Sequence, residues 1–426
     1  MEYIKKQLVM DIGNQEELSA SLDMYNMFHH LIPEYKFVFS SPKGPYPGFS
    51  SNKKFKNGAS IRSLFNDEHV IVMDPETIAE MFSEKGCSTF KIDYSISLDT
   101  QALSYLHPYV NGKKAGINDD IEEIFNFISN EDTQVDSVLY EIENLKSMDS
   151  DDNHHKIFDK LLGYEFIKEF DASKFHQTGC LSSKKSKAEL LMNTDRHFRN
   201  MLDKNKNEEF RKAMLERYNC IYIYILKISI IQISSPSRSF KNKMLELLRF
   251  AHEKASFFAT RELIVAAEFF EKGTGFKFFS KVHKNSKNIW QALRGMTWDL
   301  AHYRYLEQAI TFNMGNGERY FFPGLLSCDK GFIEVMELTS LKAVAFNSNE
   351  GPPILFYHSK DMEKITANLP ELYEFYMKLS TIENVELRGN VRNSVEYNLN
   401  SIVTELEEEL EIVSNVARPN NIILDS

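Results

Sequence analysis

Three aspartates in this sequence stand at the start of helical patterns, and two of them directly follow an apolar, strand-like run. Asp99 ends the run TFKIDYSISL, and Asp329 follows the run YFFPGLLS. Asp299 stands near the start of the amphipathic segment WDLAHYRYLEQAITF. Oxygen ligands of this kind suit Mg²⁺ or Mn²⁺, and such ions can activate water and stabilise a displacement at a phosphodiester. The spacing therefore predicts metal-assisted hydrolysis.

A fourth carboxylate, Glu262, lies inside an apolar helical stripe. In SFFATRELIVAAEFF it shares one face with Phe258, Val265 and Phe269. Burying an unpaired charge costs several kcal/mol, so a metal ion, an arginine or a second acid must satisfy it. Carboxylates gathered at one site raise one another's pKa, and a divalent cation removes that penalty. The predicted catalytic and metal-binding residues are Asp99, Glu262, Asp299 and Asp329, with Mg²⁺ or Mn²⁺ as the cofactor.

Each strand-end aspartate also has a purely structural alternative. Asp99 could cap the helix of TQALSYL, which is worth about 1 kcal/mol, and Asp329 could cap KGFIEVMEL in the same way. Asp299 could be a first-turn acid favoured by the helix dipole, worth roughly 0.3–1 kcal/mol. A carboxylate at the end of a strand can cap a helix and also face a site.

The elements that position these residues are short strands separated by helices. Strand-like runs cover His69–Met73, Thr89–Leu98, Tyr320–Ser327 and Leu341–Asn347, and helical patterns occupy most of the remaining chain. This alternation predicts a helix-rich α/β protein with a small, mostly parallel sheet covered on both faces. In such sheets, sites form at the carboxyl ends of the strands.

The segments SLDTQALSYL, WDLAHYRYLEQA and LLSCDKGFIEVMEL resemble successive acidic motifs of PIN-domain nucleases. Asp99, Asp299 and Asp329 match the first, third and fourth acids in order and context, and the last motif also has Ser327 and Phe332 in register. The resemblance implies a three-layer α/β/α core and metal-dependent cleavage of RNA or, less often, single-stranded DNA.

The second acid of this family has two candidates here. Glu262 is the choice, in RELIVAAEFF, and Glu141 in SVLYEIENL competes with it. The helical neighbours of Glu141, Ser137 and Asn144, make a more polar stripe. The sequence also departs from the family at Gln101, where the family often has Asn.

The wide separation of the motifs requires a large helical insertion if the resemblance holds. The predicted organisation is an N-terminal extension (1–88), the first part of a PIN-like core (89–147), a helical insertion (148–240), the second part of the core (241–350) and a C-terminal helical region (351–426).

A basic and aromatic segment directly precedes Asp299 and is the predicted path of the substrate. Exposed rings could stack bases at roughly 1–3 kcal/mol each, while lysines hold phosphates. The alternative is a solvated loop whose rings belong to the core. The predicted substrate-binding residues are Lys277, Lys281, Lys284, Lys287 and Arg294, interleaved with Phe276, Phe278, Phe279 and Trp290.

Composition narrows the class of protein. The formal charge of −11 argues against a protein that coats nucleic acid over its whole surface. The four cysteines (Cys87, Cys180, Cys220 and Cys328) form no CxxC pair, which suits a reducing compartment and gives no zinc site.

No feature of the sequence predicts a membrane protein. The longest apolar run, Cys220–Ile233, is too short for a membrane span and contains Lys227. The first residues, MEYIKKQLVMDIGNQEE, have acids where a signal peptide needs an apolar core. A cytoplasmic location is therefore expected.

The preferred function is that of a metal-dependent endoribonuclease acting on RNA or single-stranded nucleic acid. The alternative is a non-catalytic PIN-like or helical scaffold, in which the aspartates are only caps and the helical insertion binds a protein partner. The acidic C-terminal helix TELEEELEI would suit either function, as a dimer element or as a cover over the basic segment.

Overall fold

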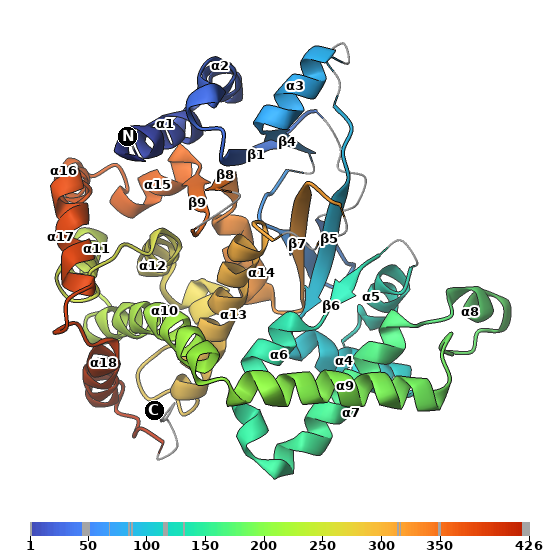
Figure 1. The fold of residues 1–426 in the computed structure, drawn as a ribbon. Coiled ribbons are helices and arrows are strands. Elements are labelled where there is room, and N and C mark those ends of the chain that lie inside the picture. The colour runs from blue at the N-terminus through green and yellow to red at the C-terminus, as the bar shows by residue number, and fades with distance from the viewer. Residues whose placement is uncertain are drawn as a thin grey trace. The chain divides into compact units, whose positions relative to one another are not determined.

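The computed structural model describes residues 2–44, 52–67, 69–83, 86, 88–113, 118–130, 133–312, 315, 317–347 and 351–419. Cys87 lies outside these residues. The chain divides into two compact units. The first comprises 1–207, 302–329 and 340–358, and the second comprises 208–301, 330–339 and 359–426. The first unit contains both helices and strands, and the second unit is helical. The protein therefore belongs to the α/β class (Figure 1).

The first unit contains the strands and ten of the helices described below. Its α-helices are α1 (Glu2–Asn14), α2 (Leu18–Phe28), α3 (Pro75–Ser83), α4 (Thr100–Val110), α5 (Ile121–Ile128), α6 (Val138–Asn144), α7 (Asp151–Lys168), α8 (Ala172–Thr178) and α9 (Lys187–Lys206), with the end of α13 (Ile289–Ala309). Its strands are β1 (Tyr35–Ser41), β2 (Lys53–Lys54), β3 (Ser60–Ser63), β4 (His69–Met73), β5 (Ile92–Leu98), β6 (Val135–Asp136), β7 (Tyr320–Ser327), β8 (Leu341–Asn347) and β9 (Ile354–Tyr357).

These strands form two sheets rather than the one mostly parallel sheet that the sequence predicts. One sheet has the order β4-β1-β8-β9 and is antiparallel throughout, and the other has the order β2-β3-β7-β5-β6. In the second sheet, β5 is parallel to both of its neighbours, β7 and β6, whereas β3 pairs antiparallel with β7. The prediction of a mostly parallel sheet is therefore wrong for the described strands, although the parallel part is the part that carries Asp99.

The antiparallel strands come largely from the N-terminal region. The sequence predicts residues 1–88 as an extension. Two strands of this region instead join the sheets, because β1 pairs with β8 and β3 pairs with β7. Apolar pattern alone shows that a segment is a strand, but not which distant strand it joins. Residues 1–88 thus supply sheet strands to the first unit.

Each sheet of the first unit has its own core. Helices α1 and α2 cover the four-stranded sheet, with Val9, Ile12 and Tyr25 packed on Phe37 and Phe39. Helices α4, α5 and α7 pack against the five-stranded sheet; this core includes Ile96, Leu98, Leu103, Phe125, Leu161 and Leu326. The close-packed core of the five-stranded sheet holds β5 and β7 in place at the end where the candidate site lies.

The second unit is helical. It contains α10 (Glu208–Ser234), α11 (Phe240–Glu253), α12 (Thr260–Lys272), the start of α13, α14 (Lys330–Leu338), α15 (Ser359–Thr366), α16 (Pro370–Leu379), α17 (Ile382–Arg392) and α18 (Leu399–Ser414). The acidic helix α18 packs along α10, where Tyr222 donates a hydrogen bond of 2.9 Å to Glu407 (Figure 1). Its apolar residues Leu406 and Leu410 are buried there. The apolar stripe of α18 is therefore used within the chain.

The segment 148–240, predicted as one insertion, contributes to both units, because the boundary falls between Asn207 and Glu208. Among the described residues, no helix is long and apolar enough to cross a membrane.

Candidate active site

The parallel pairing of β5 with β7 brings two of the predicted acids to one edge of a sheet. The register places Leu98 opposite Leu326. Asp99 directly follows Leu98, and Asp329 lies two residues beyond Ser327, the last residue of β7. Because parallel strands end on the same side, both aspartates lie at the carboxyl edge of the sheet. Figure 1 shows the two strands side by side.

Asp99 is a helix cap as well as a candidate ligand. Its side chain accepts a hydrogen bond of 2.6 Å from the backbone N–H of Ala102, at the first turn of α4. Asp99 is buried, and burial raises the pKa of its carboxyl to about 7, with the charges of Glu143 and Asp329 acting in the same direction. The amides of Ala102 and Gln101 oppose this rise. Asp329, in contrast, is exposed to solvent.

Glu143 joins this edge, although its local sequence pattern does not indicate a site residue. It lies on α6, and it accepts hydrogen bonds from the backbone and side chain of Thr100, the first residue of α4. Burial raises the pKa of the Glu143 carboxyl, while these hydrogen bonds and the Lys160 ammonium oppose the rise. The imidazole of His302 is 3.7 Å from Glu143, and burial lowers its pKa to about 4. A neutral imidazole therefore lies beside this carboxylate at pH 7.

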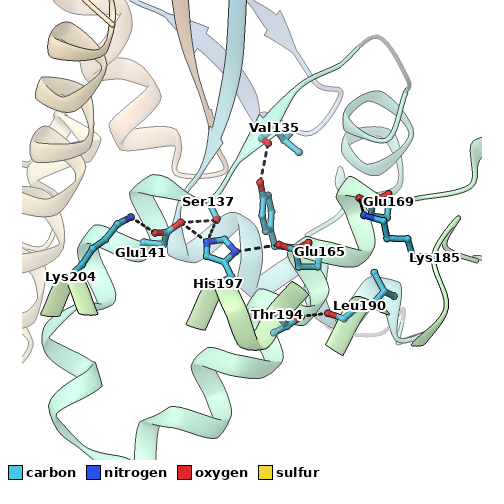
Figure 2. Close-up of polar contacts among 11 residues, drawn as sticks. Val135, Ser137, Glu141, Glu165, Glu169, Lys185, Leu190, Thr194, His197 and Lys204 are labelled. Carbon is cyan, nitrogen blue, oxygen red and sulfur yellow. Dashed lines mark hydrogen bonds and ion pairs between the residues drawn. The ribbon is translucent and has the colours of Figure 1, made fainter. Parts of the chain in front are cut away.

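Glu141, the alternative second acid of the sequence analysis, faces away from this edge. Residues two apart on a helix differ in direction by about 200°, so Glu141 and Glu143 occupy opposite faces of α6. His197 on α9 lies 2.7 Å from Glu141 and 3.3 Å from Glu165 on α7, while Lys204 donates a hydrogen bond of 2.9 Å to Glu141. Figure 2 shows His197 between the two glutamates.

This ion-paired group, Glu141, Glu165, His197 and Lys204, has a structural character. Burial lowers the pKa of His197, but its bonds to both glutamates more than compensate and raise the pKa to about 9. Burial alone would raise the pKa of Glu141; His197 and Lys204 lower it to about 2. The same imidazolium lowers the pKa of the Glu165 carboxyl, and these contacts together attach α9 to α6 and α7.

The other two predicted acids belong to the second unit. Glu262 is fully buried on α12, and Asp299 is half-buried in the part of α13 that the second unit contains. Of the four predicted ligands, the first unit therefore brings together Asp99 and Asp329, with Glu143 as the third acid beside them.

The donor set at this edge is made of carboxylate oxygens, which are the ligands that Mg²⁺ and Mn²⁺ prefer. Within the described part of the chain, no three His, Cys, Asp or Glu side chains are arranged as a ready-made metal group. Mg²⁺ commonly keeps several waters and uses only one or two protein carboxylates together with substrate phosphates. The acids at this edge fit such a partly hydrated ion rather than an all-protein cage.

Cys328 stands between Ser327 and Asp329 at the same edge. Burial raises the pKa of its thiol to about 12, and the charges of Asp99, Asp120 and Asp329 add to this effect. The thiolate form is the metal ligand and the nucleophile. Without a bound metal ion, Cys328 is therefore protonated at neutral pH.

The basic segment upstream of Asp299 has exposed lysines and buried rings. Lys277, Lys281, Lys284 and Lys287 are exposed, and Arg294 is half-buried. The four aromatic residues (Phe276, Phe278, Phe279 and Trp290) are all buried in the second unit. Trp290 donates a hydrogen bond of 3.2 Å to the carbonyl of Val416. The alternative of the sequence analysis is correct for the rings: they are core, so they do not stack on bases.

No protein-family model, curated protein or solved structure matches the chain. The resemblance to PIN-domain nucleases thus remains a prediction, which depends on the residues and the sheet edge described above.

Proposed function

We propose that Asp99, Glu143 and Asp329 form the active site of a metal-dependent nuclease that hydrolyses phosphodiesters of RNA or single-stranded nucleic acid. The parallel pairing of β5 and β7 carries this proposal, because it places Asp99 and Asp329 at one carboxyl edge. Glu143 on α6 replaces Glu262 as the second acid.

The chain's own residues divide the work at this edge. Asp99 is fixed by the first-turn amide of α4, and Glu143 is fixed by Thr100. Asp99 is buried and Glu143 is half-buried, whereas the exposed Asp329 leaves a side open to a substrate. A bound Mg²⁺ or Mn²⁺, held by one or two of these carboxylates and by water, would lower the pKa of a water molecule and stabilise charge on the phosphate.

Cleavage of a mixed pool of single-stranded RNA tests the proposal directly. Wild type with Mn²⁺ or Mg²⁺ is compared with Asp99→Asn and Asp329→Asn. Because Asn caps helices as well as Asp does, Asp99→Asn should keep its melting temperature while cleavage falls about 100-fold or more. The matched control is Asp151→Asn, since the Asp151 side chain is fully exposed on α7.

The second candidate function is a scaffold, in which Asp99 serves only as the observed cap of α4. Calorimetric titration of Mn²⁺ separates the two functions without a substrate. If the site is that of a nuclease, Mn²⁺ should bind with a measurable heat. Asp329→Asn should abolish this heat of binding, and Asp151→Asn should leave it unchanged. If the wild type shows no heat of Mn²⁺ binding, the scaffold function would be favoured.

A further inference from the structure

A groove of about 760 Å³ lies between α4, α7 and the segment that leads into α9. All of its lining residues belong to the first unit. Its volume falls in the range of sites that bind small molecules and cofactors, roughly 300–1,000 Å³. One wall begins at Ser104, which lies on α4 five residues after Asp99. The groove therefore starts about 8 Å along α4 from the carboxylate edge.

The charge of this groove is opposite to the charge of the chain. Lys113, Lys185 and Lys187 line it, and Asp159 is the acid among its lining residues. Lys185 pairs with Glu169 at 2.6 Å, whereas Lys113 and Lys187 are exposed. In a protein with a formal charge of −11, such a local excess of lysine favours an anionic ligand.

The groove also has apolar residues in its lining. Leu162 and Phe166 on α7 and Pro108 on α4 line it, and the Phe166 ring is half-buried. Helices α4 and α7 pack closely here: a Cβ added at Gly163 would lie 3.1 Å from the His107 ring. A lining that combines an aromatic ring with lysines suits a base stacked on the ring and phosphates held by the lysines.

The remaining wall is held in place by backbone contacts. Ser183 forms an isolated β-bridge with Phe170, at the end of α7, and the N–H of Lys184 donates a hydrogen bond of 2.7 Å to the carbonyl of Glu169. Ser186 then begins α9 with a capping box. Lys185 and Lys187 are thus presented from a fixed segment, which lowers the entropic cost of binding.

A polar link connects the groove with the carboxylate edge. Lys160 donates a hydrogen bond of 2.9 Å to Ser104, which lines the groove. The same ammonium attracts the Glu143 carboxylate. A strand bound in the groove would therefore lead along α4 towards Asp99 and Glu143.

We propose that the groove between α4 and α7 binds nucleotides of a single-stranded nucleic acid, with Lys113 and Lys187 on its phosphates. The inference deepens the proposed nuclease function and rests on it for the direction of the strand. It also replaces Lys277, Lys281, Lys284, Lys287 and Arg294 as the predicted substrate-binding residues.

Fluorescence anisotropy with a labelled decamer of oligouridylate, in EDTA and over a series of salt concentrations, tests the groove without cleavage. For single strands, each phosphate contact contributes about 0.7 to the slope of log K against log salt. The double variant Lys113→Gln/Lys187→Gln should therefore lose about 1.4 from this slope. Asp159→Asn should tighten binding several-fold at low salt, a gain that a folding defect would not produce.

The matched control is Lys277→Gln/Lys281→Gln, which removes the same charge from exposed positions of the second unit. Neither lysine lines the groove, so this variant should bind like the wild type. Equal losses in both double variants, or no binding by the wild type at low salt, would overturn the inference. So would inorganic polyphosphate that displaces the decamer as well as unlabelled oligouridylate does.

The binding and cleavage measurements distinguish failure of the groove proposal from failure of the nuclease proposal. Groove-dependent binding without metal-dependent cleavage would reject the nuclease and leave the binding site established. Cleavage that depends on Asp99, together with binding that the groove substitutions leave unchanged, would reject the groove alone.

Discussion

The Nε2 atom of His197 lies 2.7 Å from a carboxylate oxygen of Glu141, and this contact joins α9 to α6 (Figure 2). The other ring nitrogen lies 3.3 Å from Glu165 on α7. One imidazolium thus links three helices of the first unit. The contact also explains why Glu141 is unavailable to the carboxylate edge, since its two oxygens accept from His197 and Lys204.

The first prediction concerns the pH dependence of this contact. The pKa of His197 is raised to about 9 from an ordinary 6.5, so its contribution to stability is complete below pH 6.5 and is lost as the pH rises through 9. The pKa of Glu141 is lowered to about 2 from 4.5, so its contribution is complete above pH 4.5 and is lost as the pH falls towards 2. Stability from the pair should therefore be greatest between pH 4.5 and 6.5.

The substitution His197→Gln should cost on the order of 3 kcal/mol at pH 6, because it leaves buried carboxylates without their cation. At pH 9.5 the cost should be much smaller. Hydrogen exchange of the α9 amides measures it, because both tryptophans, Trp290 and Trp298, belong to the second unit and would not report on α9. Arg199→Gln on the same helix removes an exposed ion pair and should change little. A cost independent of pH would contradict the assignment of charge.

The second prediction separates the two glutamates of α6. Glu143→Gln should reduce metal-dependent RNA cleavage by about 100-fold or more, with little change in the protection of α9. Glu141→Gln should instead lower the protection of α9, because it weakens the contact with His197. Parallel measurements of cleavage and hydrogen exchange on both variants check this. If Glu143→Gln and Glu141→Gln reduced cleavage equally while the two variants were equally stable, Glu143 would have no special role in cleavage.

The sequence predicts the local elements of the site better than its partners. The strand at His69–Met73 is confirmed as β4, and the strand-like run that ends at Leu98 is confirmed as β5. Pattern alone also places Asp99 at the start of a helix, where it indeed caps α4. These features depend on neighbours a few residues away, which periodicity and capping preferences report directly.

The features that depend on distant partners were not predictable in this way. The mostly parallel sheet is wrong because β1 and β3 come from the region predicted as an extension. The apolar stripe around Glu262 favours it over Glu141, but nothing in the local pattern indicates Glu143, whose charge acts on Asp99 in the folded chain. Glu141 and Glu143 are two positions apart on α6, so they occupy opposite faces of that helix.

The third prediction contrasts two helical glycines. A Cβ at Gly13, on α1, would overlap the ring of Phe356, which is buried on β9. Overpacking costs about 1–3 kcal/mol, which exceeds the gain of up to about 1 kcal/mol in helix propensity. Gly295, inside α13, has no atom within 4 Å of such a Cβ.

Gly13→Ala should therefore destabilise the protein, and Gly295→Ala should stabilise it. Thermal unfolding followed by circular dichroism measures both. The double variant Gly13→Ala/Phe356→Leu should recover part of the loss, because the two positions are in contact. Stabilisation by Gly13→Ala would show that α1 moves away from β9 at little cost.

The last prediction concerns the hydrogen bonds that hold β3, the strand that pairs with β7. Asp120 accepts hydrogen bonds from the backbone N–H and the side-chain amide of Asn57, at 2.6 and 2.9 Å, and from the N–H of Ala59 at 2.9 Å. These bonds fix the turn before β3, the strand that pairs with β7. Hydrogen bonds to a charged group are worth about 1.5–3 kcal/mol each, and they are not fully additive.

Asp120→Ala should therefore cost about 3 kcal/mol and raise hydrogen exchange at Asn57 and Ala59 before the rest of the first unit. Asp120→Asn keeps one acceptor oxygen and should lie between this variant and the wild type. Because β7 ends beside Asp329, the loosened edge should also lower metal-dependent cleavage in proportion to the loss of protection. Unchanged exchange at Ala59 in Asp120→Ala would show that β3 is held by its pairing with β7 alone.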